Sequence, residues 1–163
     1  MCGIVGYVGP GDALHVAIEG LRRLEYRGYD SAGVASVSDG VISVRKKAGK
    51  LANLEAEMAA DPVPSAHTAI GHTRWATHGA PNDVNAHPHL SADGSIAVIH
   101  NGIIENFATL RDELRAAGVT LRSETDTEVV AHLLAAEMDD QTPLADALRA
   151  VCRRLTGAFT LVV

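Results

Sequence analysis

The order of the apolar patterns constrains the fold of this chain most, because strand-like runs and helical patterns do not alternate strictly along it. A short apolar run from Gly3 to Val8 stops at a glycine–proline turn, which favours a strand. Asp39-Gly40 separates two further strand-like runs and is a strong hairpin signal. A regular βαβ array would require strict alternation. The order therefore predicts an α+β chain with mixed sheets and helices packed on them.

The expected elements follow from apolar residues at helical or alternating spacing. Asp12 is a good cap for the first helix, because its carboxylate can accept backbone N–H bonds. A long polar loop over 76–90 is expected to be functional, since structureless loops of this length are uncommon in small domains. The expected helices cover 14–24, 51–58, 107–114, 123–134 and 144–155, and the expected strands cover 3–8, 32–37, 41–46, 68–75, 95–99 and 158–163.

Composition and charge exclude several classes of protein. The 163 residues are 47% apolar and carry a net charge of −6, which argues against a nucleic-acid or acidic-membrane surface. No apolar run is long enough for a membrane span, and the N-terminus lacks the pattern of a signal peptide. Cys2 and Cys152 are the only cysteines and form no disulfide framework. A reducing, cytoplasmic location is therefore expected.

Cys2 directly follows the initiator methionine and is the first candidate for chemistry. Methionine before a small residue is commonly removed, which would make Cys2 the N-terminal residue. Such a cysteine carries a nucleophilic thiol and a base, its own α-amine, in one residue. The amine has a reference pKa of about 7.7–8.0, against about 10.4 for lysine. It therefore suits proton transfer near neutral pH.

Three further positions offer groups that such a nucleophile would need. Arg74 ends an expected strand and can bind a carboxylate with two parallel hydrogen bonds, although a surface salt bridge is the simpler explanation. Asn101 and Gly102 can donate to an oxyanion, or form a plain turn after a strand. Asp126 can bind an ammonium group, or cap a helix. Taken together, these groups predict hydrolysis of the side-chain amide of a free amino acid, for which glutamine is the obvious candidate.

Eight histidines, including His87 and His89, raise a metal-binding protein as an alternative. No zinc-type ligand spacing occurs among them, and no phosphate-binding glycine motif is present. We therefore expect neither a metal nor a cofactor.

Several segments resemble the class II glutamine amidotransferases, whose catalytic cysteine is the N-terminal residue. Within that family they are most similar to the members that aminate a sugar phosphate. The matching segments are MCGIVG at 1–6, LRRLEYRGYDSAG at 21–33, HTRWATHG at 72–79, NAHPH at 85–89, HNGIIEN at 100–106 and SETDTE at 123–128. The resemblance covers nearly the whole chain and implies a four-layer α/β/β/α sandwich of the N-terminal-nucleophile hydrolase type.

The resemblance also implies a role for each candidate. Cys2 would attack the glutamine amide to form a thioester, its α-amine would move the proton, and Asn101 with the Gly102 N–H would hold the oxyanion. Arg74 would bind the α-carboxylate and Asp126 the α-ammonium. The residues implied to lie in the loop that closes over glutamine are Trp75, Thr77 and His78. Arg27 is implied to lie near the nucleophile. For the single tryptophan, Trp75, packing in the core is the alternative.

Family members of this kind are longer than this chain. Residues 1–163 are therefore expected to be a truncated glutaminase domain, incomplete at its C-terminus, without the two sugar-isomerase domains that would bind fructose 6-phosphate and complete amino-sugar synthesis. The full-length enzyme is expected to be a homodimer. A second hypothesis is a non-catalytic glutamine-binding fragment, inactive through truncation or a retained Met1. Retention would displace the free amine by about 3.8 Å.

Overall fold

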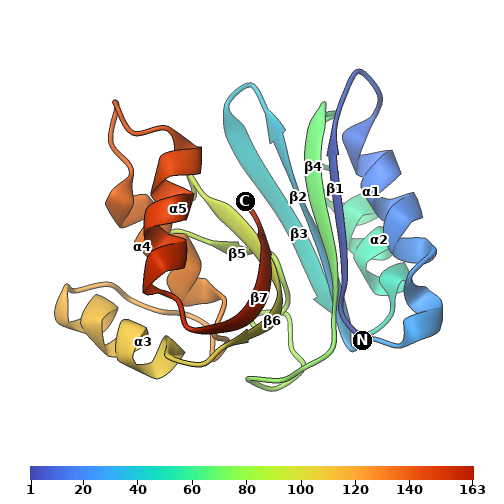
Figure 1. Ribbon diagram of the computed structural model, residues 1–163. Helices are drawn as coiled ribbons and strands as arrows, with labels where there is room; N and C mark the ends of the chain where they lie inside the picture. Colours follow the sequence, from blue (N-terminus) through green and yellow to red (C-terminus); the bar gives the residue numbers. More distant parts are fainter.

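A computed structural model describes all residues, 1–163, and shows four layers (Figure 1). One outer layer holds α1 (Ala13–Arg22) and α2 (Leu51–Ala60), which pack on a four-stranded sheet. A three-stranded sheet follows, and the other outer layer holds α3 (Phe107–Ala116), α4 (Glu128–Glu137) and α5 (Leu144–Arg154). The expected α/β/β/α arrangement is confirmed. None of these helices has the length and apolar character that a membrane crossing requires.

The first sheet is antiparallel, in the order β1-β4-β2-β3. Its strands are β1 (Gly3–Val8), β2 (Ser31–Ser38), β3 (Val41–Ala48) and β4 (Thr68–Arg74). Asp39 and Gly40 have φ of 51° and 77° and join β2 to β3, as expected for a two-residue hairpin turn. Gly3 pairs with Thr73, so the start of the chain lies beside the end of β4.

The second sheet has the order β5-β6-β7, with β5 (His89–Leu90), β6 (Ala97–Ile104) and β7 (Gly157–Val162). β6 is longer than the expected 95–99. The prediction that Asn101 and Gly102 follow a strand was wrong, because both lie within β6 and pair with Thr160 and Phe159 of β7. The pairing with a distant strand extends β6 beyond its apolar part.

Helix α4 begins at Glu128, later than the expected start at 123–126. Before it, the Glu128 carboxylate accepts the backbone N–H groups of Arg122 and Ser123, each at 2.7 Å, and the Ser123 hydroxyl at 2.7 Å. Burial raises the pKa of Glu128, but hydrogen bonds from His132, Arg122 and Ser123 outweigh it and lower that pKa to about 2. These bonds fold 122–127 as a loop, which a helical sequence pattern does not reveal.

Two apolar cores hold the sheets to their helices. One has ten buried residues, from α1, α2 and the first sheet, and the other has thirteen, from α3, α4, α5 and the second sheet. On β4, Gly71 faces α1, where an added Cβ would lie 3.2 Å from Leu21. Because side chains alternate along a strand, His72 and Arg74 point away from α1, towards the second sheet.

Candidate active site

A cavity of about 460 Å³ lies where β1, β4 and β6 meet the loops that precede α4 and follow β4. All nine residues selected from the sequence line it, although they are far apart along the chain. They are Cys2, Arg27, Arg74, Trp75, Thr77, His78, Asn101, Gly102 and Asp126. Sequence reasoning assigned no part in glutamine binding or hydrolysis to the other lining residues, which are Met1, His87, His100, Ile103 and Thr125.

Cys2 is half-buried and lies just before β1. Its Sγ accepts the backbone N–H of Trp75 at 3.1 Å. The pairing of β1 with β4 produces this contact across 73 residues of sequence. The Met1 ammonium donates to the carbonyls of Gly28, at 2.9 Å, and Arg27, at 3.3 Å. The start of the chain is therefore held against the loop that follows α1, with Arg27 beside it.

Asn101 and Gly102 present an amide and a backbone N–H at the cavity wall. The simple turn considered for them is wrong, since both belong to β6. Gly102 has φ of 117°, and an added Cβ would lie 2.1 Å from the carbonyl oxygen of Ala158. The close approach of β7 therefore requires glycine at this position.

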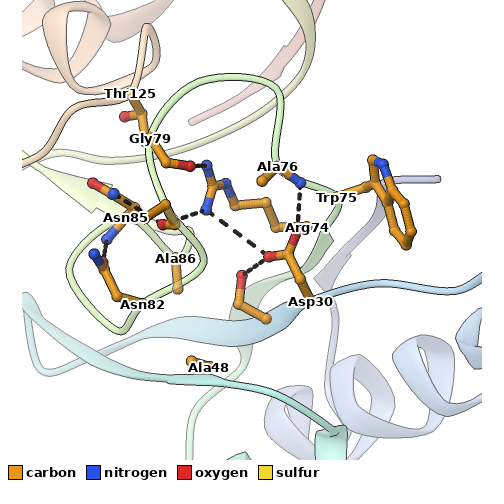
Figure 2. A network of polar contacts seen from close by, with 12 residues as sticks. Asp30, Ala48, Arg74, Trp75, Ala76, Gly79, Asn82, Asn85, Ala86 and Thr125 are labelled. Carbon is orange, nitrogen blue, oxygen red and sulfur yellow. Dashed lines mark hydrogen bonds and ion pairs between the residues drawn. The ribbon is translucent and has the colours of Figure 1, made fainter.

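Arg74 is only 3% exposed, so the surface salt bridge considered for it is wrong. Its guanidinium donates to the carbonyls of His78, Gly79 at 3.0 Å and Ala80 at 3.4 Å, and lies 3.9 Å from the Asp30 carboxylate. Asp30 also accepts the N–H of Ala76 (Figure 2). Arg74 thus both lines the cavity and holds the loop that follows β4.

Asp126 is 4% exposed, and its Oδ2 accepts the backbone N–H of Ile104 at 2.9 Å. The helix cap considered for it is wrong, because the residue at the N-cap of α4 is Thr127. Its other oxygen lies 3.9 Å from His100 Nδ1. The bond to β6 places a carboxylate in the cavity wall, where it can attract a cation.

The loop after β4 covers one side of the cavity. Trp75 is 55% exposed, so packing in the core is wrong for this side chain. His78 contacts Phe107 edge-on, with ring centroids 4.9 Å apart. With Thr77, these side chains form a wall that belongs to a loop and not to a strand.

Contacts that sequence reasoning did not find tie this loop to the segment before α4. The Asn85 amide bonds both the backbone N–H and the carboxylate of Glu124, at 2.9 and 3.0 Å. Farther along, His87 Nε2 lies 2.9 Å from Thr127 Oγ1, and His89 Nε2 lies 3.0 Å from Thr125 Oγ1. The polar residues at every second position, 85, 87 and 89, were the available signal that this segment is bonded along one side.

Lys46 of β3 was also missed. Its ammonium donates to three carbonyls of the same loop, those of Val84 at 3.1 Å, Ala86 at 2.7 Å and Pro88 at 3.1 Å. Burial lowers its pKa to about 8. A lysine in a strand gives no sequence signal for such a contact, because its partners are backbone atoms some 40 residues away.

The buried histidines contact one another in pairs. His72 and His87 stack with ring centroids 4.3 Å apart, and His87 and His89 lie 4.7 Å apart. No three histidine, cysteine or acidic side chains are arranged to hold a metal ion. Burial lowers the pKa of His72 to about 4 and lowers those of His87, His89 and His100. These rings are therefore neutral near pH 7.

The four-layer fold and this cavity define the class of the protein. Two solved structures share the fold over 99% of this chain and 34% of their own: Bacillus subtilis glutamine phosphoribosylpyrophosphate amidotransferase, with TM-score 0.81 and 27% identity, and a structure described as the allosteric regulatory enzyme of purine biosynthesis, with TM-score 0.83 and 28% identity. The model of the glutamine amidotransferase domain matches residues 59–163. The chain belongs to this family.

Curated relatives narrow the comparison to one kind of amidotransferase. The chain is 65% identical over 162 residues to glutamine–fructose-6-phosphate aminotransferase (isomerizing) of Streptomyces coelicolor and 60% identical over 163 residues to that of Leifsonia xyli. The corresponding enzyme of Mycobacterium tuberculosis is 57% identical over 167 residues. Each match covers 99% of this chain, which spans about a quarter of the relatives' length, 26–27%.

Proposed function

We propose that this chain hydrolyses L-glutamine to glutamate and ammonia, with Cys2 as the nucleophile once Met1 has been removed. The observation that supports this most is the convergence of a thiol, oxyanion donors, an arginine and a carboxylate on one cavity. A glutamine side chain needs these groups together: a nucleophile at its amide, donors for the developing oxyanion, and opposite charges for its α-carboxylate and α-ammonium.

The reaction would run in two balanced steps. The Cys2 thiol adds to the amide carbon while its α-amine, directly or through a water, takes the thiol proton. Asn101 and the Gly102 N–H stabilise the oxyanion. When the tetrahedral intermediate collapses, the α-amine passes the proton to the amide nitrogen. Ammonia leaves, and a thioester remains on Cys2. Water then adds to the thioester, and the thiol leaves with a proton as glutamate forms.

Arg74 and Asp126 would select a free α-amino acid. The Asp126 carboxylate is held by β6 and attracts the α-ammonium, while Arg74 supplies positive charge for the α-carboxylate. Part of the Arg74 guanidinium bonds the loop carbonyls. Substrate binding and loop position would therefore be linked through this residue, and Trp75, Thr77 and His78 would cover the bound glutamine.

In a longer protein, we propose that residues 1–163 are the glutaminase domain and that the ammonia is used to aminate fructose 6-phosphate on sugar-isomerase domains in the remainder. The names of the curated relatives and their nearly fourfold greater length support this assignment. A cytoplasmic homodimer is proposed for that longer enzyme.

Labelling with 6-diazo-5-oxo-L-norleucine, a glutamine-like diazoketone, tests the nucleophile. We expect one adduct, formed with loss of N₂, on an N-terminal Cys2 from which Met1 is absent, as read by intact mass and peptide mapping. Cys2→Ala should abolish both the adduct and glutamate release.

Cys152→Ser is the matched control, because Cys152 is a free, half-buried thiol on α5 that does not line the cavity. That variant should label normally. Labelling that persists in Cys2→Ala, or an unlabelled chain that has lost Met1, would contradict the proposal. An unlabelled chain that retains Met1 would favour the non-catalytic alternative for the unprocessed form.

Arg74→Lys should raise the apparent KM for glutamine by about tenfold or more. The single ammonium of lysine cannot replace a planar guanidinium that bonds the loop carbonyls and the glutamine α-carboxylate at the same time. Glutamate release at varied glutamine concentration measures this. Arg45→Lys is the control, since Arg45 pairs with an exposed Asp61 and does not line the cavity. An unchanged KM in Arg74→Lys would remove Arg74 from substrate binding.

A further inference from the structure

His72 lies on β4 and Asn101 on β6, so a contact between them joins the two sheets (Figure 1). His72 Nε2 lies 2.9 Å from Asn101 Oδ1 and 3.0 Å from the His100 carbonyl oxygen. The His72 ring is fully buried, and its Nδ1 has no partner. All polar contacts of this ring are therefore made by one nitrogen.

The two neighbours of Nε2 determine which nitrogen carries the proton. A carbonyl oxygen can only accept, so Nε2 must be the donor, shared between the His100 carbonyl and the Asn101 amide. A proton on Nδ1 would leave one buried N–H unsatisfied and turn the Nε2 lone pair towards an oxygen. Leaving a buried donor unpaired is unfavourable by about 1–3 kcal/mol.

The same donor determines how the Asn101 amide is oriented. Its Oδ1 must face His72, so its NH₂ group is turned to the opposite side of the amide. Asn101 lines the cavity beside Gly102, and the NH₂ group is the only part of this side chain that can donate to an oxyanion. An amide free to rotate would present its oxygen to the cavity in part of the population.

We infer that His72 is a positioning residue, whose Nε2–H holds Asn101 Oδ1 so that the Asn101 NH₂ group faces the site of the oxyanion. This inference rests on the proposed glutaminase function. Burial keeps the His72 ring neutral, which fits this role, because protonation on Nδ1 would place a buried charge beside the His87 ring. His72 would not touch glutamine, and it does not line the cavity.

Steady-state glutamate release from four variants tests the inference. His72→Leu should lower kcat by about 10- to 100-fold, somewhat less than the loss of an oxyanion donor, with KM within about threefold of wild type. His72→Gln keeps an N–H donor and should recover most of kcat. In an Asn101→Ala background, His72→Leu should have little further effect, because both changes remove one function. The inference would be overturned if the kcat losses of the two single variants multiplied in the double variant, or if kcat were unchanged in His72→Leu.

Long-range ¹H–¹⁵N NMR of the unmodified chain gives a readout that needs no variant. We expect His72 to be the neutral Nε2–H tautomer from pH 5.5 to 8, and an Nδ1–H tautomer would overturn the inference even if a variant failed to fold. Failure of the proposed function has a different signature, which is a wild-type chain with no Cys2-dependent adduct or glutamate release. The inference would then fall with that function.

Discussion

Replacing Gly102 with alanine is expected to abolish glutamine hydrolysis and to lower the free energy of unfolding by about 2–6 kcal/mol. The new Cβ would lie 2.1 Å from the Ala158 carbonyl oxygen and 2.8 Å from the Phe159 Cα, both backbone atoms of β7. The backbone at Gly102 also has φ of 117°, which L side chains rarely adopt. The strands must separate or the backbone must rotate, and either change moves the oxyanion N–H.

Chemical denaturation and diazoketone labelling measure the two parts of this prediction. Gly94→Ala is the control, because Gly94 has φ of 75° but no atom within 4 Å of an added Cβ. It should show backbone strain alone, about 1–2 kcal/mol, with normal activity. If Gly102→Ala were no less stable than Gly94→Ala and hydrolysed glutamine normally, the close packing of β7 and the oxyanion role of Gly102 would both be wrong.

The second large effect is acid unfolding between about pH 6.5 and 4. Burial lowers the pKa of His72 to about 4 and lowers those of three other histidines from their ordinary value near 6.5. In this range the unfolded chain binds more protons than the folded one, so stability falls as the pH falls. Each histidine contributes a slope of about 1.4 kcal/mol per pH unit within its own window. The four residues are His72, His87, His89 and His100.

Other charges near these four histidines change the size of the stability loss at low pH but not its sign. Arg74 and Lys46 lower the histidine pKa values further, while Glu128 opposes this at His89 and Asp126 at His100. Because several protons are taken up together, the loss should be a large share of the stability of an ordinary domain, which is about 5–15 kcal/mol.

Urea unfolding at a series of pH values gives the slope directly. His89→Gln should reduce the proton uptake on unfolding near pH 5.5 by about one, since glutamine keeps a polar group near Thr125 but does not titrate. His15→Gln, at an exposed site on α1, is the control and should leave the slope unchanged. Equal slopes in the two variants would show that burial of His89 does not control acid stability.

Much of the fold was predictable because its signals are local. Asp12 accepts the N–H groups of Leu14 and His15 at the start of α1, and Asp39-Gly40 forms the hairpin, as predicted. Each signal operates within a few residues and depends little on the rest of the chain. The boundaries that differed from prediction were those of β6 and α4. Pairing with β7 decides the end of β6, and the hydrogen bonds that Glu128 accepts from residues 122 and 123 decide the start of α4.

The site residues were selected by chemical type and by resemblance, and the sequence alone left a simple structural alternative for most of them. For Arg74, Asn101 and Asp126, the tertiary structure removed the alternative, since the first is buried, the second lies in a strand and the third bonds β6. Their catalytic roles stay proposals.

By itself, the sequence determined the local elements, the reactive groups available and the family that they resemble. Only the tertiary structure decided which groups meet: Cys2 with the Trp75 N–H, Lys46 with three loop carbonyls, and His72 with Asn101. The physical reason is that periodicity and turn chemistry act over a few residues. These contacts depend instead on strand register and sheet stacking, which bring together residues from 29 to 73 positions apart.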